Sequence, residues 1–78
     1  MTIQQMKYFI TVADSGSISE AAKRLYAAQS SVSSAIKEIE FYYGVTAFSR
    51  DSKGVCLTKE GEELLIEFKG ILTRLEFL

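Results

Sequence analysis

The stretch at residues 17–40, SISEAAKRLYAAQSSVSSAIKEIE, decides the fold because it holds two short amphipathic helical patterns with only a few residues between them. In the first pattern Ala21, Ala22 and Leu25 recur at i, i+1 and i+4. Two alanines on one face allow the backbone of another helix to come close. A pair of short helices joined by a tight turn is the arrangement of a helix-turn-helix.

The second pattern places an apolar stripe and a polar face on opposite sides of one helix. The apolar residues recur at i, i+3, i+4 and i+7, and they are Val32, Ala35, Ile36 and Ile39. The opposite face carries Ser30, Ser34 and Lys37, with Gln29 and Ser33 on its flanks. A helix that is buried on one side and carries small hydrogen-bonding groups on the other can lie in the major groove of DNA. The stretch therefore predicts a DNA-reading helix-turn-helix.

Length and composition restrict the remaining classes. A chain of 78 residues forms one domain with one small core. With 47% hydrophobic and 24% charged residues, the composition is that of a globular protein, without a membrane-spanning run. The N-terminus MTIQQMKYF does not resemble a signal peptide, so we expect a cytoplasmic protein. A single cysteine, Cys56, and the absence of histidine exclude an internal disulfide and the usual zinc ligands, and no cofactor is expected.

The net charge of −1 is unusual for a protein that binds nucleic acid, but the charges are unevenly distributed. Up to Lys59 the chain has seven basic and five acidic residues, whereas from Glu60 onward it has two basic and five acidic residues. The acidity therefore belongs to the C-terminal helix, and the bulk charge does not argue against DNA binding.

Four helices and one hairpin account for the whole chain. We expect helices over residues 2/3–14, about 29–43 and 59–78, and a short second helix that follows Ser17 and carries Ala21, Ala22 and Leu25. A turn at residues 50–54 is expected to lead into a short strand at 55–57. Ser17 and Glu20, three positions apart, predict a capping box at the second helix. Gly44 suits a left-handed cap at the end of the third helix, and Thr58 is a good N-cap for the last one. The predicted fold is mainly α: a three-helix core, a small β-hairpin wing and a long linker helix.

The last helix carries an apolar stripe that continues to the final residue without a capping glycine, proline or polar tail. A small core cannot absorb so long a stripe, so we expect its distal half to pair with a second copy of the chain; the alternative is a helix that folds back on its own domain. The absence of a C-terminal cap on this helix also suggests that the chain is a piece of a longer regulator. The expected dimerisation residues are Leu64, Leu65, Phe68, Ile71, Leu72 and Leu75, and the stripe ends at Leu78.

Taken together, these motifs closely resemble the N-terminal DNA-binding domain of LysR-type transcriptional regulators. The resemblance covers essentially all 78 residues, and its strength lies in the order and spacing of five stretches, each weak alone. They are MKYFITVADSGSISEAAKRL (6–25), QSSVSSAI (29–36), GV (44–45), FSR (48–50) and LTKEG (57–61). The resemblance implies a winged helix-turn-helix at residues 1–58, a dimerising linker helix at 59–78, and double-stranded DNA as partner. It also implies a homodimer, allows a tetramer for the full-length protein, and places any small-molecule effector on a C-terminal domain absent from this chain.

The family's DNA contacts can be carried over residue by residue. They imply base reading by the third helix, and phosphate or minor-groove contacts by Arg50 and by the wing around Lys53. Gln29 can bond to both hydrogen-bonding atoms of one adenine, whereas serines bond to bases or phosphates with little selectivity. The implied residues of the third helix are Gln29, Ser30, Ser31, Ser33 and Ser34, and the polar face adds Lys37.

Three departures from the family's pattern matter most. Ala28 stands where a serine or threonine usually caps the recognition helix and reaches phosphate. Ser34 stands where arginine is frequent, and Phe41 and Tyr42 replace charges near the end of the third helix. These changes suggest a weaker intrinsic affinity for DNA, or reliance on the dimer and on the missing domain.

Other interpretations of the same residues remain open. The serine cluster is also compatible with a solvated helix start, Arg50 with an ion pair to Asp51 or a glutamate, and Lys53 with a simple turn lysine. Phe41 and Tyr42 are expected to pack on a neighbouring element. No usual set of catalytic residues can be assembled, so we do not expect an enzyme. The competing function is a winged-helix module for protein interaction or dimerisation that does not bind DNA.

Overall fold

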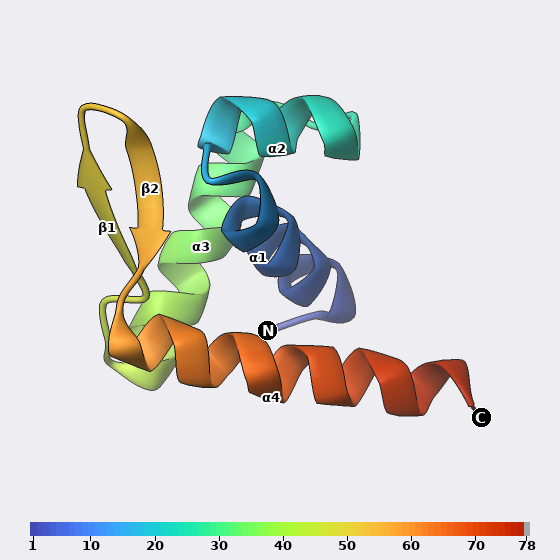
Figure 1. Ribbon diagram of the computed structural model, residues 1–78. Helices are drawn as coiled ribbons and strands as arrows, with labels where there is room; N and C mark the ends of the chain where they lie inside the picture. Colours follow the sequence, from blue (N-terminus) through green and yellow to red (C-terminus); the bar gives the residue numbers. More distant parts are fainter. Residues whose placement is uncertain (78) are drawn as a thin grey trace.

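The computed structural model describes residues 1–77 and has the predicted winged helix-turn-helix architecture (Figure 1). Three helices form a bundle, a two-stranded hairpin stands at one side, and the last helix runs across the opposite end from the second helix. Leu78, the last residue of the predicted apolar stripe, lies outside the described residues. The elements are α1 (Ile3–Ser15), α2 (Ile18–Leu25), α3 (Gln29–Tyr43), β1 (Phe48–Asp51), β2 (Gly54–Leu57) and α4 (Lys59–Glu76).

Three aromatic rings from distant parts of the chain meet at the centre of the core. The ring of Phe9 in α1 lies 4.9 Å from that of Phe48 in β1 and 5.0 Å from that of Phe68 in α4, the second pair edge to face. Such pairs stabilise a core beyond the area they bury. The apolar stripe predicted for α3 is confirmed, because Val32, Ala35, Ile36 and Ile39 are all buried.

The helix ends are capped partly as expected. Thr2 and Gln5 form a reciprocal capping box at the start of α1, which was not predicted from the sequence. The box predicted for Ser17 and Glu20 is only half formed: Ser17 Oγ accepts from the amide of Glu20 at 3.2 Å, but the amide of Ser17 donates to Ser15 Oγ. The carboxylate of Glu20 is instead 3.9 Å from Arg24.

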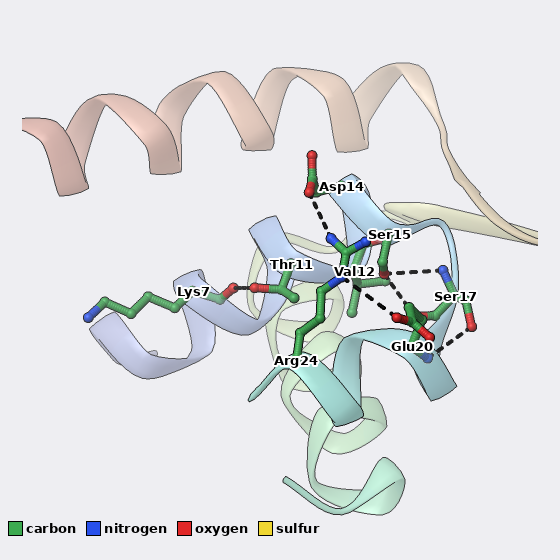
Figure 2. Close-up of polar contacts among 8 residues, drawn as sticks. All are labelled: Lys7, Thr11, Val12, Asp14, Ser15, Ser17, Glu20 and Arg24. Carbon is green, nitrogen blue, oxygen red and sulfur yellow. Dashed lines mark hydrogen bonds and ion pairs between the residues drawn. The ribbon is translucent and has the colours of Figure 1, made fainter. Parts of the chain in front are cut away.

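Polar contacts tie α2 to the end of α1 (Figure 2). Nη1 of Arg24 donates to the carboxylate of Asp14 at 2.9 Å, and Ser15 Oγ donates to the carbonyl of Ser17 at 3.0 Å. The ion pair is largely exposed and contributes little to stability by itself. The left-handed Gly16 between the helices sets the direction in which α2 leaves α1.

The wing is an antiparallel hairpin in which Phe48 pairs with Leu57 and Asp51 with Gly54. The predicted turn at residues 50–54 was too long, because β1 and β2 together include three of those residues and the chain reverses over positions 52 and 53. A bond from the amide of Lys53 to Asp51 Oδ1 (2.8 Å) closes this tight turn, so the strands can continue into it.

The wing also rests against the turn between α1 and α2. The amide of Val55 donates to the carbonyl of Gly16 at 3.0 Å. Gly54 has φ +136°, and a Cβ at that position would lie 2.4 Å from the same carbonyl oxygen. Glycine is therefore required for the hairpin to approach the turn, and the approach sets the position of the wing.

In α4 the apolar stripe divides into a buried and a more exposed part. Phe68 is fully buried in the core of its own chain, so its assignment to the dimerisation face was wrong. The side chains of Leu64 and Leu65 are half-buried against the same core, whereas Leu75 is 40% exposed. Thr58 caps the helix as predicted, with its Oγ1 accepting from the amide of Gly61 at 3.1 Å. Within residues 1–77 no helix is long and apolar enough to span a bilayer.

The two faces of α3 give a first prediction about stability. Ile36 is buried in the middle of the stripe, so Ile36→Ala should lower the free energy of unfolding by about 2–5 kcal/mol through the lost contacts and the cavity. Ser34 lies exposed on the other side, and Ser34→Ala should change stability by less than about 0.5 kcal/mol. Urea denaturation measures both values, and equal midpoints for the two variants would contradict this orientation of α3.

A second prediction is that alanine substitutions at two glycines of α4 change the stability of the domain in opposite directions. A Cβ at Gly61 would lie 2.0 Å from the backbone oxygen of Ala47, so Gly61→Ala should destabilise the domain by about 1–3 kcal/mol or more. At Gly70 a Cβ meets nothing within 4 Å, and Gly70→Ala should stabilise the helix by roughly 0.5–1 kcal/mol. Thermal unfolding of both variants tests the close approach; a Gly61→Ala variant as stable as the parent would disprove it.

Candidate nucleic-acid interface

One face of α3 is exposed and polar along its first three turns. Ser30, Ser34 and Lys37 lie on the side opposite the buried stripe, and all three are exposed, as is Gln29 at the first position of the helix. Ala28 provides no side-chain bond at the N-cap, as the sequence predicted. The face thus presents hydroxyl, amide and ammonium groups to solvent, and helix packing on the other side holds them in place.

Ser31 and Ser33 lie at the two edges of this face. Ser31 is directed toward α1, where it lines a shallow hollow together with Gln4, Tyr8 and Ser34. Ser33 is half-buried on the side of the wing. The five residues carried over for α3 therefore do not form one cluster, because Ser31 belongs to the α1 edge and Ser33 to the wing edge.

The wing brings an arginine to the recognition helix. Nη2 of Arg50, in β1, donates to Ser33 Oγ at 3.5 Å. Among the described residues both ion pairs involve Arg24, so the structure does not support the alternative in which Arg50 pairs with Asp51 or a glutamate. Lys53 is exposed at the tip of the hairpin. Arg50 thus places a positive charge beside the polar face of α3, and Lys53 carries another at the tip of the wing.

The nearby carboxylates of α3 are engaged elsewhere. Oε2 of Glu40 accepts from the backbone amides of Ala47 at 2.7 Å and of Phe48 at 3.3 Å, at the entry to the wing. Glu38 accepts a hydrogen bond from the side chain of Gln5. The carboxylate of Glu40 is thus directed to the entry of the wing, and the exposed Glu38 lies at the α1 edge of the polar face.

Three exposed aromatic residues lie on or beside this surface. Phe41 is 89% and Tyr42 68% exposed, so the expectation that they pack on a neighbouring element was wrong; they line an open groove with Met1 and Gln5. Tyr26, in the turn before α3, is 98% exposed. Tyr26 was not among the residues predicted from the sequence, because its left-handed backbone and its exposure are properties of the fold and not of a local pattern.

Residues 1–77 contain no group of three or more cysteine, aspartate or glutamate side chains that could hold a metal ion. Cys56 lies in β2, as expected, and is exposed, with its Sγ 3.1 Å from Ser49 Oγ across the hairpin.

Comparisons with known proteins agree with the assignment of this surface as a nucleic-acid interface. Residues 3–62 match the model of the bacterial regulatory helix-turn-helix proteins of the lysR family. The HTH-type transcriptional regulator BsdA of Bacillus subtilis is 43% identical over 77 residues, which are 97% of this chain and 27% of that protein. The HTH-type transcriptional regulator GalR of Pseudomonas putida is 40% identical over 74 residues, 95% of this chain and 19% of that protein. The chain thus spans a quarter or less of the length of several curated relatives that it matches.

Solved structures show the same fold in the presence of DNA. The CbnR DNA-binding domain in a DNA complex superposes with a TM-score of 0.93 and 34% identity, over 97% of this chain and 87% of that chain. The BenM DNA-binding domain bound to the benA site 1 DNA gives a TM-score of 0.91 and 28% identity, over 97% and 88% of the two chains. The family match over most of the chain, together with a relative more than 40% identical, leads to one conclusion: this chain belongs to the LysR family of bacterial transcriptional regulators.

Proposed function

We propose that residues 1–58 are the sequence-specific DNA-binding domain of a bacterial transcriptional regulator, and that residues 59–78 link two such domains in a homodimer. The observation that carries this proposal is the polar face of α3 with Arg50 of the wing beside it, 3.5 Å from Ser33. The DNA complexes of the CbnR and BenM domains support the choice of DNA as partner. Because the role requires access to the chromosome, we place the protein in the cytoplasm.

In this proposal α3 enters the major groove by its N-terminal half. An α-helix with side chains is about 10–12 Å across and the groove is about 12 Å wide, so the helix fills it. Gln29 makes the directed base contact, to an adenine, and Ser30, Ser34 and Lys37 follow along the same face. Ser33 and Ser31, at the edges of the helix, meet the groove walls. Arg50 and Lys53 contact phosphates or the adjacent minor groove and fix the register.

In this proposal two chains pair through α4, and the homodimer is the form that binds DNA. Two copies present two recognition helices to half-sites in major grooves about one helical turn, or a multiple of it, apart. The residues proposed for this interface are Leu64, Leu65, Ile71, Leu72 and Leu75, without Phe68. Since several relatives are about four times as long as this chain, we propose that the full-length protein binds its effector in a region beyond residue 78 and can assemble further into a tetramer.

The competing function, a winged-helix module that binds another protein, predicts a different response to salt. DNA binding releases counterions from phosphates, so its affinity falls steeply as the salt concentration rises. The exposed Phe41 and Tyr42 are compatible with a protein partner, but they do not account for the polar face or for Arg50 beside it.

The residues proposed for base reading and for phosphate contact should respond differently to substitution. Gln29→Ala should reduce the difference in binding free energy between specific and random duplexes by about 1–3 kcal/mol, with nearly the same salt slope. Arg50→Ala should weaken binding to both duplexes and lower the salt slope by about one unit, because one phosphate contact is lost. Fluorescence anisotropy at several salt concentrations measures both effects.

Unfolding of the Arg50→Ala variant would show instead that Arg50 has a structural role. Circular dichroism of each variant provides this control. If neither substitution changed binding to any duplex, the DNA-reading assignment would be wrong and the protein-interaction module would take its place.

The dimer interface can be tested at the end of α4. Leu75→Asp should shift the chain from dimer to monomer, because a carboxylate replaces an apolar side chain that its own domain leaves 40% exposed. Thr73→Asp, on an exposed position away from the stripe, is the matched control and should leave the dimer intact. Sedimentation equilibrium measures both; a parent chain that stays monomeric at high concentration would contradict the proposal.

A further inference from the structure

Tyr26 combines an unusual backbone with an unusual exposure. It has φ 53° and ψ 41°, and it is the one non-glycine residue of the described chain with a positive φ. Its amide donates to the carbonyls of Ala22 and Lys23, so this left-handed residue ends α2. Its side chain is 98% exposed, more than that of any other large hydrophobic residue in residues 1–77.

Neither the turn nor the core accounts for a tyrosine at this position. The ends of α1 and α3 use the same left-handed conformation, and there the residues are Gly16 and Gly44. Side chains other than those of glycine, asparagine and aspartate raise the energy of this conformation. Since the ring of Tyr26 buries almost no surface, packing does not compensate. Contact with a partner outside the chain would compensate.

The place of Tyr26 in the fold identifies this partner. The residue lies three positions before Gln29, in the connection that leads from α2 into the N-terminus of α3. Because a helix fills the major groove, a side chain beside its entering end faces the groove wall, which consists of sugars and phosphates. Tyrosine is among the side chains that donate hydrogen bonds to phosphate oxygens.

We infer that Tyr26 contacts the sugar–phosphate backbone at the edge of the major groove and positions the start of α3 on the DNA. The inference rests on the proposed function of α3. The hydroxyl donates to a phosphate oxygen, and the ring lies against the adjoining sugar. A tyrosine hydroxyl adds no positive charge, so this contact strengthens binding without adding to the release of counterions. Tyr26 is therefore a positioning contact of a different kind from Arg50.

The experiment compares the 78-residue chain with its Tyr26→Phe and Tyr26→Asn variants in thermal unfolding and in duplex binding at several salt concentrations. Tyr26→Phe removes only the hydroxyl and should weaken binding to specific and random duplexes by the same factor, about three- to tenfold, with an unchanged salt slope. Tyr26→Asn removes the ring as well and should weaken binding further. Because asparagine tolerates the left-handed conformation, this variant should also melt a few degrees higher. Tyr42→Phe removes an exposed hydroxyl near the C-terminal end of α3, away from the end that enters the groove; it is the matched control and should bind as the parent does.

A Tyr26→Asn variant with higher thermal stability but lower affinity for DNA would show that Tyr26 acts in binding, because replacing a purely structural tyrosine would not raise the stability. If Tyr26→Asn lowered the melting temperature and the affinity together, Tyr26 would support the fold and the inference would be wrong. It would also be wrong if both Tyr26 variants bound as the parent does while Gln29→Ala lost specificity, an outcome that leaves the proposed function intact. Absence of DNA binding by the parent chain would instead refute the proposed function, and the inference with it.

Discussion

The backbone of Ala47 is the point on which the arrangement of this domain depends. Its amide donates to the carboxylate of Glu40 in α3, and its carbonyl accepts from the amide of Thr58 at the start of α4. The residue is fully buried, and only a glycine, Gly61, allows α4 to come so close to it. A bond to a charged acceptor is stronger than one between neutral groups, particularly away from water. The backbone of this one residue therefore connects the recognition helix, the wing and the linker helix.

A second contact between α3 and β1 lies two helical turns away. Glu40 binds the amides at the start of β1, and Ser33, seven residues earlier in α3, receives the bond from Arg50 further along the strand. The helix and the strand therefore run antiparallel with a polar contact at each end. The inner contact is partly buried and charge-assisted, whereas the outer one is long and exposed. The charge-assisted contact fixes the base of the wing, whereas the end nearer the tip is positioned mainly by the bond from Val55 to Gly16 and not by Arg50.

The sequence predicted the elements whose signals are local. The spacing of Val32, Ile36 and Ile39 was sufficient to orient α3, and Gly44 and Thr58 marked helix boundaries through their cap chemistry. Two kinds of feature were not predictable in this way. Phe68 belongs to an apolar stripe that continues past the core, and periodicity alone cannot show where core contact ends. The role of Glu40 depends on amides seven and eight residues away, after a change of direction that no local pattern specifies. Of the proposed interface, the polar face of α3 was predictable, but the meeting of Arg50 and Ser33 was not.

The acidic residues of α4 have a consequence for how the domain meets DNA. α4 runs along the end of the molecule opposite α2 and the tip of the wing, and its exposed side chains include Glu60, Glu62, Glu63 and Glu67 (Figure 1). Although α4 also holds Lys59, Lys69 and Arg74, its acidic residues outnumber its basic ones, and this excess of negative charge away from Arg50 and Lys53 gives the domain an electric dipole. In the field of a polyanion such a dipole is turned so that its positive end leads, and encounters with α4 foremost are repelled. The chain therefore has a small net charge but a dipole that orients it as it diffuses toward DNA. At physiological ionic strength, screening limits this electrostatic effect to about 8 Å.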